Sequence, residues 1–173
     1  IPATHVVLSG QAFDDQWLRE HDNLAALEID FLMIDDCPVT AAGLNGLVSQ
    51  HPIEYLSVEN IQDGDAVAAL LTEKTSLWCA SFHGTDLSDA GFRQLPLEQF
   101  TVVSVEGTRV TPTGLQELKR CRRLGQLWLD GRQFDESVAE LLRIQNQDLW
   151  LSLAGSDVTD AHLDLLHGTR VRR

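Results

Sequence analysis

Acidic side chains recur at a nearly constant spacing in this sequence of 173 residues, and they are the first candidates for chemistry. Asp35, Glu59, Glu106 and Asp130 are carboxylates, and His83 stands between Glu59 and Glu106, so that neighbouring members are 23 or 24 positions apart. Carboxylates held about 5 Å apart can serve a retaining glycosidase. A row of like charges can instead attract the Lys and Arg side chains of a partner.

Four aromatic residues accompany these carboxylates: Phe31, Tyr55, Trp128 and Trp150. Rigid aromatic side chains surrounded by charge are typical of protein-binding hot spots. The same rings could stack on the sugars of a carbohydrate or cell-wall ligand. Two interpretations without function stay open: the carboxylates form an ordinary solvated face, and the tryptophans cover the sheet of a C-terminal unit that has lost its neighbour.

Catalytic and metal-binding motifs do not accompany these residues. The sequence contains neither GxSxG nor a phosphate-binding glycine loop, and no Ser, Cys or Lys has the partners of an activated nucleophile. The aspartates near Asp14 and Asp63 could suggest calcium, but no loop has the alternating ligands of an EF-hand, and helix caps and turns account for them. We therefore expect no enzyme activity, no cofactor and no metal.

The elements that must position these side chains are repeated along the chain. From Val103 to Leu118 the sequence reads VSVEGTRVTPTGLQEL, with an apolar alternation, a turn at Gly107, Thr111 as a helix N-cap and Pro112 at the first helical position. One such unit cannot bury its own apolar face and needs copies stacked on it. Equivalent strand residues recur 23 to 26 positions apart: Leu8, Ile34, Val58, Phe82, Val105, Leu129 and Leu153.

Columns read down the units support one register. The inward strand position two residues earlier is apolar throughout: Val6, Leu32, Leu56, Ala80, Val103, Leu127 and Leu151. A turn column contains residues that tolerate positive φ: Gly10, Asp36, Asn60, Gly84, Gly107, Gly131 and Gly155. The expected helix N-caps are Asp14, Thr40, Gly64, Ser88, Thr111, Asp135 and Thr159. The third unit has Asp63 at an apolar position, so we expect Ile61 to be buried instead and the NIQDGD loop to be distorted.

The segments LWLDGRQF, VSVEGTRVTPTGLQEL, FHGTDLSDAGFRQL and LSLAGSDVTDAHLDLL resemble the leucine-rich repeat family, in the short variant with a GTxVTDxGLxxL tail. The resemblance covers essentially the whole chain. It implies an α/β fold, a right-handed solenoid with a horseshoe arc of about seven repeats of about 24 residues. The parallel sheet would form the concave face and the helices the convex face of a single domain over residues 1–173. The family's usual role, binding another macromolecule, is implied as well.

Residues that flank the buried strand positions must face the concave surface, because side chains alternate along a strand. The first outward column reads His5, Phe31, Tyr55, Cys79, Val102, Gln126 and Trp150. The second reads Val7, Met33, Ser57, Ser81, Ser104, Trp128 and Ser152, and the third reads Ser9, Asp35, Glu59, His83, Glu106, Asp130 and Ala154. The residues predicted to contact a protein partner are Phe31, Tyr55, Trp128, Trp150, Asp35, Glu59, His83, Glu106 and Asp130.

The charge balance restricts the partners. A net charge of −13 and a pI near 4.6 argue against nucleic acid and anionic membranes and fit a basic protein. The single basic cluster, LKRCRRL at Leu118–Leu124, lies at a helix end, where cations complement the helix dipole; the alternative is a convex docking site for an acidic partner. Three cysteines without a CxxC pair indicate no disulfide framework and slightly favour a reducing, cytoplasmic compartment.

The chain ends also carry expectations. No apolar run approaches the ~20 residues that span a bilayer, and the chain opens with IPATHVVL, without Met or a signal peptide. It stops at GTRVRR, where an eighth strand should begin, and neither end shows the polar cap that solenoids need. We expect a fragment of a longer protein, whose localisation and oligomeric state stay open. A structural spacer in that protein is the third alternative, beside protein binding and carbohydrate binding.

Overall fold

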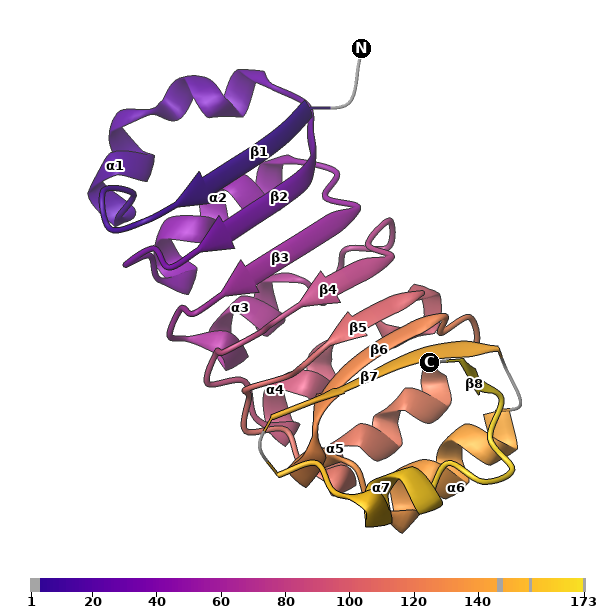
Figure 1. The fold of residues 1–173 in the computed structure, drawn as a ribbon. Helices are drawn as coiled ribbons and strands as arrows, with labels where there is room; N and C mark the ends of the chain where they lie inside the picture. The colour runs from indigo at the N-terminus through magenta and orange to yellow at the C-terminus, as the bar shows by residue number, and fades with distance from the viewer. Residues whose placement is uncertain (1–3, 146–147, 156, 173) are drawn as a thin grey trace.

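Eight parallel strands form one sheet in the computed structural model, which describes residues 4–145, 148–155 and 157–172. The order of the strands in the sheet is their order in the sequence. They are β1 (Thr4–Ser9), β2 (Ile29–Asp35), β3 (Tyr55–Glu59), β4 (Cys79–Ser81), β5 (Val102–Ser104), β6 (Gln126–Asp130), β7 (Leu149–Ala154) and β8 (Val171–Arg172). Each strand is therefore a rung beside its sequence neighbour, which is the arrangement of an α/β solenoid (Figure 1).

Helical segments connect successive strands and gather on one face of the sheet (Figure 1). The α-helices are α1 (Asp15–Glu20), α2 (Ala41–Gln50), α3 (Gly64–Leu70), α4 (Asp89–Gln94), α5 (Pro112–Leu115), α6 (Glu136–Gln145) and α7 (Asp160–Asp164). Short 3₁₀ helices follow some of the strands and α-helices: η1 (Asp22–Ala26), η2 (Leu97–Gln99), η3 (Gln116–Arg120) and η4 (Gly131–Gln133). Within the described residues, no helix is long and apolar enough to cross a membrane.

The predicted strand register is confirmed at each pair from β1 to β7. The inward residues Val6, Leu32, Leu56, Ala80, Val103, Leu127 and Leu151 pair in that order across the sheet. The first outward column is also confirmed, from His5 opposite Phe31 to Gln126 opposite Trp150. Because the side-chain period of a strand is two, this register decides which residues enter the core and which face outward.

The core is a continuous ribbon between the sheet and the helices. Leu56 and Leu127 of the strands and Leu44, Leu115 and Leu118 of the helical side are each 0% exposed. Burying a leucine side chain contributes about 1.5–3 kcal/mol. The chain as a whole buries its apolar surface by stacking each unit on its neighbours, because no single strand and helix encloses a core of its own.

Positive φ angles confirm most of the predicted turn column. Gly10, Gly84, Gly107 and Gly155 and the non-glycines Asp36 and Asn60 all have φ between 53° and 97°. The prediction is wrong for Gly131, which begins η4. A Cβ atom at Gly131 would lie 2.9 Å from the backbone of Asp157 and Val158, so glycine is needed there because two backbones approach closely, and not because its φ is positive.

Helix caps confirm the predicted N-cap column with one correction. The side chains of Asp14, Thr40, Ser88 and Thr111 accept hydrogen bonds from backbone N–H groups of their helices, and Asp135 Oδ1 accepts from Val138. Thr159 is the N-cap of α7. Gly64 is the first residue of α3, and the N-cap is Asp63 with φ 67° and ψ 27°. The Gly64 N–H donates to Asp86 Oδ1 of the following unit at 2.6 Å.

The third unit is distorted as predicted. Ile61 is 3% exposed and occupies the core, while Asp63 adopts the left-handed conformation that replaces the usual side-chain cap. The structure thus accommodates the polar residue by a local change of backbone conformation. Register on either side of this loop is unaffected, since β3 pairs with both β2 and β4 in the predicted alignment.

Candidate functional site

The sheet face opposite the helices, called here the open face, contains a row of aromatic rings at its N-terminal half. Phe31 and Tyr55 stack with ring centroids 4.1 Å apart and planes 8° apart. The ring centroids of His5 and Phe31 are 4.7 Å apart. The rings of Trp78 and Tyr55 are in an edge-to-face arrangement with centroids 5.8 Å apart. In this aromatic row each ring contacts the ring of an adjacent unit.

Trp78 belongs to this row although the sequence columns did not select it. It precedes β4 by one residue and is 40% exposed. Its backbone N–H donates to the carbonyl of Glu54, so it already pairs with the neighbouring unit. Trp78 lies one residue before the strand, outside the columns that the repeat defines, so no column signal in the sequence marks it.

A hollow of 310 Å³ lies at the centre of the open face. Ser81, Ser104, Cys79 and Val102 line it from β4 and β5, and Tyr55 and Trp128 line it from β3 and β6. Glu59, His83 and Glu106 complete its lining. The hollow forms because small side chains of β4 and β5 separate two strands that carry large rings.

The predicted row of carboxylates divides into two kinds. Asp130 Oδ2 accepts from the Gly107 N–H at 3.0 Å and pairs with Arg132 Nη2 at 3.0 Å, and its side chain is 13% exposed. Asp35 accepts from Asn60 Nδ2 at 3.2 Å and from Ser9 Oγ at 3.5 Å. Like charges on neighbouring strands repel one another, and donors within the chain offset part of this repulsion at Asp130 and Asp35.

Glu59 and Glu106 are the carboxylates that face the hollow. Ser57 Oγ donates to Glu59 Oε1 at 2.8 Å, and His83 Nδ1 lies 3.9 Å from Glu106 Oε2. Arginine and lysine do not occur among the residues that line the hollow. The hollow is consequently a region of concentrated negative potential in a chain of net charge −13.

The structure brings together five of the nine predicted partner-contacting residues at the hollow: Tyr55, Trp128, Glu59, His83 and Glu106. Phe31 belongs to the aromatic row, and Asp35 lies beyond it on β2. Trp150 is 57% exposed on β7, opposite Gln126, and does not line the hollow. Trp128 and Trp150 are thus on adjacent strands but in different columns of the open face, as their register requires.

Burial raises the pKa of two side chains of the hollow, Cys79 and Tyr55. It raises the pKa of the Cys79 thiol to about 12. The pKa of Tyr55 is raised by burial and by the nearby Cys79 and Glu59. At neutral pH the thiol is protonated, so Cys79 lacks the thiolate that nucleophilic attack or metal ligation requires. Among the described residues, no group of three or more His, Cys, Asp and Glu side chains could hold a metal ion.

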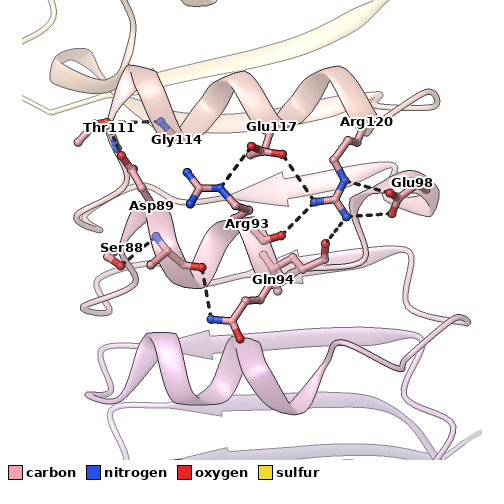
Figure 2. Close-up of polar contacts among 11 residues, drawn as sticks. Ser88, Asp89, Arg93, Gln94, Glu98, Thr111, Gly114, Glu117 and Arg120 are labelled. Atoms are coloured by element: carbon pink, nitrogen blue, oxygen red, sulfur yellow. Dashed lines mark hydrogen bonds and ion pairs between the residues drawn. The ribbon is translucent and has the colours of Figure 1, made fainter.

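The basic cluster on the helical side takes part in a network of ion pairs (Figure 2). Arg120 donates to both carboxylate oxygens of Glu98 at 2.9 and 3.2 Å, and to the backbone carbonyls of Arg93 and Leu95. These carbonyls lie at the end of α4, so Arg120 caps the helix of the preceding unit. The hydrogen bond from Arg120 also lowers the pKa of Glu98. The sequence predicted that this cation complements the end of its own helix. In the structure it complements the end of α4, the helix of the preceding unit.

A second hollow, of 290 Å³, lies between α1 and α2 and is mostly apolar. Leu18, Leu24 and Leu47 line it together with Gly43 and Gly46. The glycines of α2 present no side chain to this space. Its lining contains one cation, Arg19, and no carboxylate, so it lacks the charge and ring geometry of the open face.

Comparison with known proteins adds little to these observations. No family model matches the chain, and no curated protein matches it closely enough to count as a relative. Among solved structures, an internalin (inlF) from Listeria monocytogenes matches with a TM-score of 0.39 and 14% sequence identity, over 83% of this chain and 53% of that one. The chain therefore spans about half of the length of that structure. At this TM-score the likeness supports no argument, and the architecture stands on the strand order and register described above.

Proposed function

We propose that this chain is a leucine-rich repeat module of seven units that binds a basic protein partner through its open face and has no catalytic activity. The observation that carries the proposal is the hollow of 310 Å³ with its aromatic and acidic lining. Large rings and carboxylates meet there on a sheet whose opposite side already packs against the helices. Aromatic residues that converge on a concave surface are the usual anchors of protein interfaces.

Charge supports a basic partner in particular. The chain carries 26 acidic and 13 basic side chains, and several of the arginines are already paired on the helical side. An excess negative potential over the open face increases the association rate of a positively charged protein and disfavours acidic ones. Binding should therefore weaken as ionic strength rises, because salt screens charges beyond about 8–10 Å.

The test compares partner binding by the intact chain and by a Trp128→Ala, Trp150→Ala double variant. The immobilised proteins capture partners from a lysate of the source organism, and each captured protein is then purified and titrated against both. We expect the double variant to bind at least about tenfold more weakly, because hot-spot aromatics each contribute on the order of 2 kcal/mol. Thermal unfolding of the double variant checks that the fold is retained.

The matched control is Ile144→Ala, Leu163→Ala. Both residues are exposed and lie on helices, Ile144 at 72% and Leu163 at 40%. This variant removes apolar surface from the helical side and should leave the dissociation constant unchanged. If it weakens binding while the tryptophan variant does not, the partner docks on the helices and the proposal is wrong. Binding that is indifferent to salt and directed to sugars would favour the carbohydrate alternative.

A further inference from the structure

The floor of the hollow contains a hydroxyl group that makes no hydrogen bond within the described residues. Ser81 is 8% exposed, and its hydroxyl makes no hydrogen bond within the described residues. On the adjacent strand the hydroxyl of Ser57, which is also buried, donates to Glu59. Because Ser81 lines the hollow and its hydroxyl has no partner within the described residues, a ligand that brings a hydrogen-bond donor into the hollow can reach it.

Two carboxylates in the lining of the hollow have acceptor atoms that are not in use. The Oε2 atom of Glu59 and the Oε1 atom of Glu106 accept no hydrogen bond from the described part of the chain. Glu59 ends β3 and Glu106 follows β5, so the two carboxylates are two strand spacings apart, roughly 10 Å. A donor-rich cation that enters between them can reach one or both and can donate to Ser81 below.

Tyr55 and Trp128 provide the sides of the same space. Cations bind over aromatic faces, most strongly over tryptophan, and arginine does so more often than lysine because its guanidinium is planar. The guanidinium also carries five N–H donors in a fixed fork that matches carboxylates. A volume of 310 Å³ is at the lower end of the ~300–1,000 Å³ typical of ligand pockets, which suits one side chain better than an oligosaccharide.

We infer that the hollow is a receptor for a single arginine side chain of the partner protein, which stacks on Trp128 and donates to Glu59, Glu106 and Ser81. This inference rests on the proposed function, since the arginine belongs to the basic protein that docks on the open face. It adds the chemical identity of the central contact. His83 Nδ1 lies 3.9 Å from Glu106 Oε2, too far for a hydrogen bond, so the Glu106 carboxylate can still accept from the guanidinium.

The experiment titrates the chain with the blocked tripeptide acetyl-Gly-Arg-Gly-amide and follows ¹H–¹⁵N chemical shifts. The comparison peptide replaces arginine with citrulline, which has almost the same shape but no charge. We expect the arginine peptide to shift the backbone amides of Ser81, Ser104 and Glu106 and the indole N–H of Trp128. The citrulline peptide should bind at least tenfold more weakly, because the charge-assisted hydrogen bonds are lost. Equal binding of the two peptides overturns the inference.

Two variants locate the contact. Glu59→Gln, Glu106→Gln keeps the shape of the hollow and should weaken the arginine peptide about tenfold, since each partly exposed ion pair contributes modestly. The control Glu28→Gln, Glu73→Gln changes the net charge equally at two exposed residues that do not line the hollow. Equal weakening by both variants would show a general charge effect and overturn the inference.

A third variant closes the hollow without changing its charge. Ser104→Ile places a branched side chain, which strands favour, on the floor beside Trp128. It should abolish the peptide-induced shifts while the unfolding temperature stays close to that of the parent chain. If a lysine tripeptide or an oligosaccharide shifts the same signals at lower concentration than the arginine peptide does, the assignment to arginine is wrong.

Failure of this inference and failure of the proposed function give different results. If the partner requires Trp128 and Trp150 but the arginine and citrulline peptides bind alike, the open face binds a protein and the hollow is not an arginine receptor. If the arginine peptide occupies the hollow but every captured partner is indifferent to the tryptophan variant, the hollow binds guanidinium groups and the proposed function is wrong.

Discussion

Single residues of the row of carboxylates have different roles in spite of their common spacing. Glu59 and Glu106 face the hollow, whereas Asp130 is held by a backbone N–H, by Arg132 and by Gln133. The sequence could place all of them on one face because register follows from the repeat. It could not show that the Gly107 amide and Arg132 would turn toward Asp130, because such donors depend on the exact path of the loops.

The structural role of Asp130 leads to a stability prediction. Asp130→Ala removes the acceptor of the Gly107 N–H and the ion pair with Arg132, and it breaks the capping box of η4. We expect the free energy of unfolding to fall by about 1–2 kcal/mol, as for the loss of a helix cap. Urea denaturation measures this change.

Asp35→Ala is the matched control for that experiment. Its two hydrogen bonds, to Ser9 and Asn60, lie at the exposed surface. The expected change is within about 0.5 kcal/mol, as for most surface substitutions. Equal effects of the two substitutions would mean that the ion pair and the hydrogen bonds of Asp130 add no more stability than the surface hydrogen bonds of Asp35 do.

His51 adds a pH dependence at the scale of one side chain. It is 3% exposed, and its Nε2 atom has no hydrogen-bond partner in the described residues. Burial and the charge of Lys74 lower its pKa below the ordinary value of 6.5. The unfolded chain therefore takes up a proton at this residue before the folded chain does, so stability is fully present above about pH 6.5 and falls as the pH decreases through the lowered pKa.

The substitution His51→Gln should remove this contribution. We expect the free energy of unfolding of the parent chain to decrease between pH 7 and pH 5, and the variant to show a smaller decrease over the same interval. Urea denaturation at several pH values measures both slopes. Carboxylates titrate mostly below this window, so identical slopes for the two proteins would mean that His51 accepts its proton without cost in the fold.

At the scale of elements, successive helices are joined by one repeated device. Asp89, in the first turn of α4, accepts from the N–H and the hydroxyl of Thr111, the N-cap of α5, both at 2.7 Å (Figure 2). Asp65 binds Ser88 and Asp15 binds Thr40 in the same way. Each of these aspartates binds the N-cap residue of the next helix and so orders the start of that helix. This explains why an aspartate recurs one position after the predicted N-cap in these units.

Glycine in the receiving helix makes room for the aspartate. A Cβ atom at Gly114 would overlap Asp89 Oδ1, and Gly43 and Gly91 meet Asp15 and Asp65 in the same manner. Where the sequence has Ala41 or Pro112 in place of the aspartate, the next helix has valine at the glycine position, Val67 or Val138. Close approach, and not φ, therefore selects these glycines.

Gly114→Ala tests this pairing. The three atoms nearest to the added Cβ all belong to Asp89, so we expect a loss of about 1–3 kcal/mol in the free energy of unfolding. In an Asp89→Ala background the same change should cost much less, because the overlapping carboxylate is gone. The control Gly46→Ala, in open space within α2, should instead stabilise the chain by about 0.5–1 kcal/mol. Additive effects of Gly114→Ala and Asp89→Ala would refute the pairing.

Sequence patterns predicted elements better than connections. Caps and strand registers follow from local chemistry and from the period of the side chains, and they were mostly confirmed. Gly131 and Gly64 were assigned wrongly because each is governed by a neighbouring unit: Gly131 by the backbone at Asp157, and Gly64 by the carboxylate of Asp86. Trp78 was missed because it precedes the strand and enters the open face through its ring contact with Tyr55.

At the scale of the whole molecule, stability is a sum over neighbouring units, so it should vary along the chain. Core residues of the central strands, such as Leu56 and Leu127, are 0% exposed, whereas Val6 of β1 and Leu153 of β7 are only partly buried. Within the described sheet, β1 pairs with β2 alone, and β7 has only the two-residue strand β8 beyond it. Local opening should therefore require less free energy near β1 and β7 than near β3 to β6.

Native-state amide exchange and two matched substitutions test this gradient. We expect the amides of β3 to β6 to exchange most slowly, with protection that decreases towards β1 and β7. Leu56→Ala should cost about 2–5 kcal/mol, because it leaves a cavity in a fully enclosed layer. Leu153→Ala, the same change in a partly buried site, should cost less and should raise exchange mainly in β7. Uniform protection along the sheet would mean that the units open together. The interaction free energies between neighbouring units would then exceed the differences in stability among the units, and the expected gradient would be wrong.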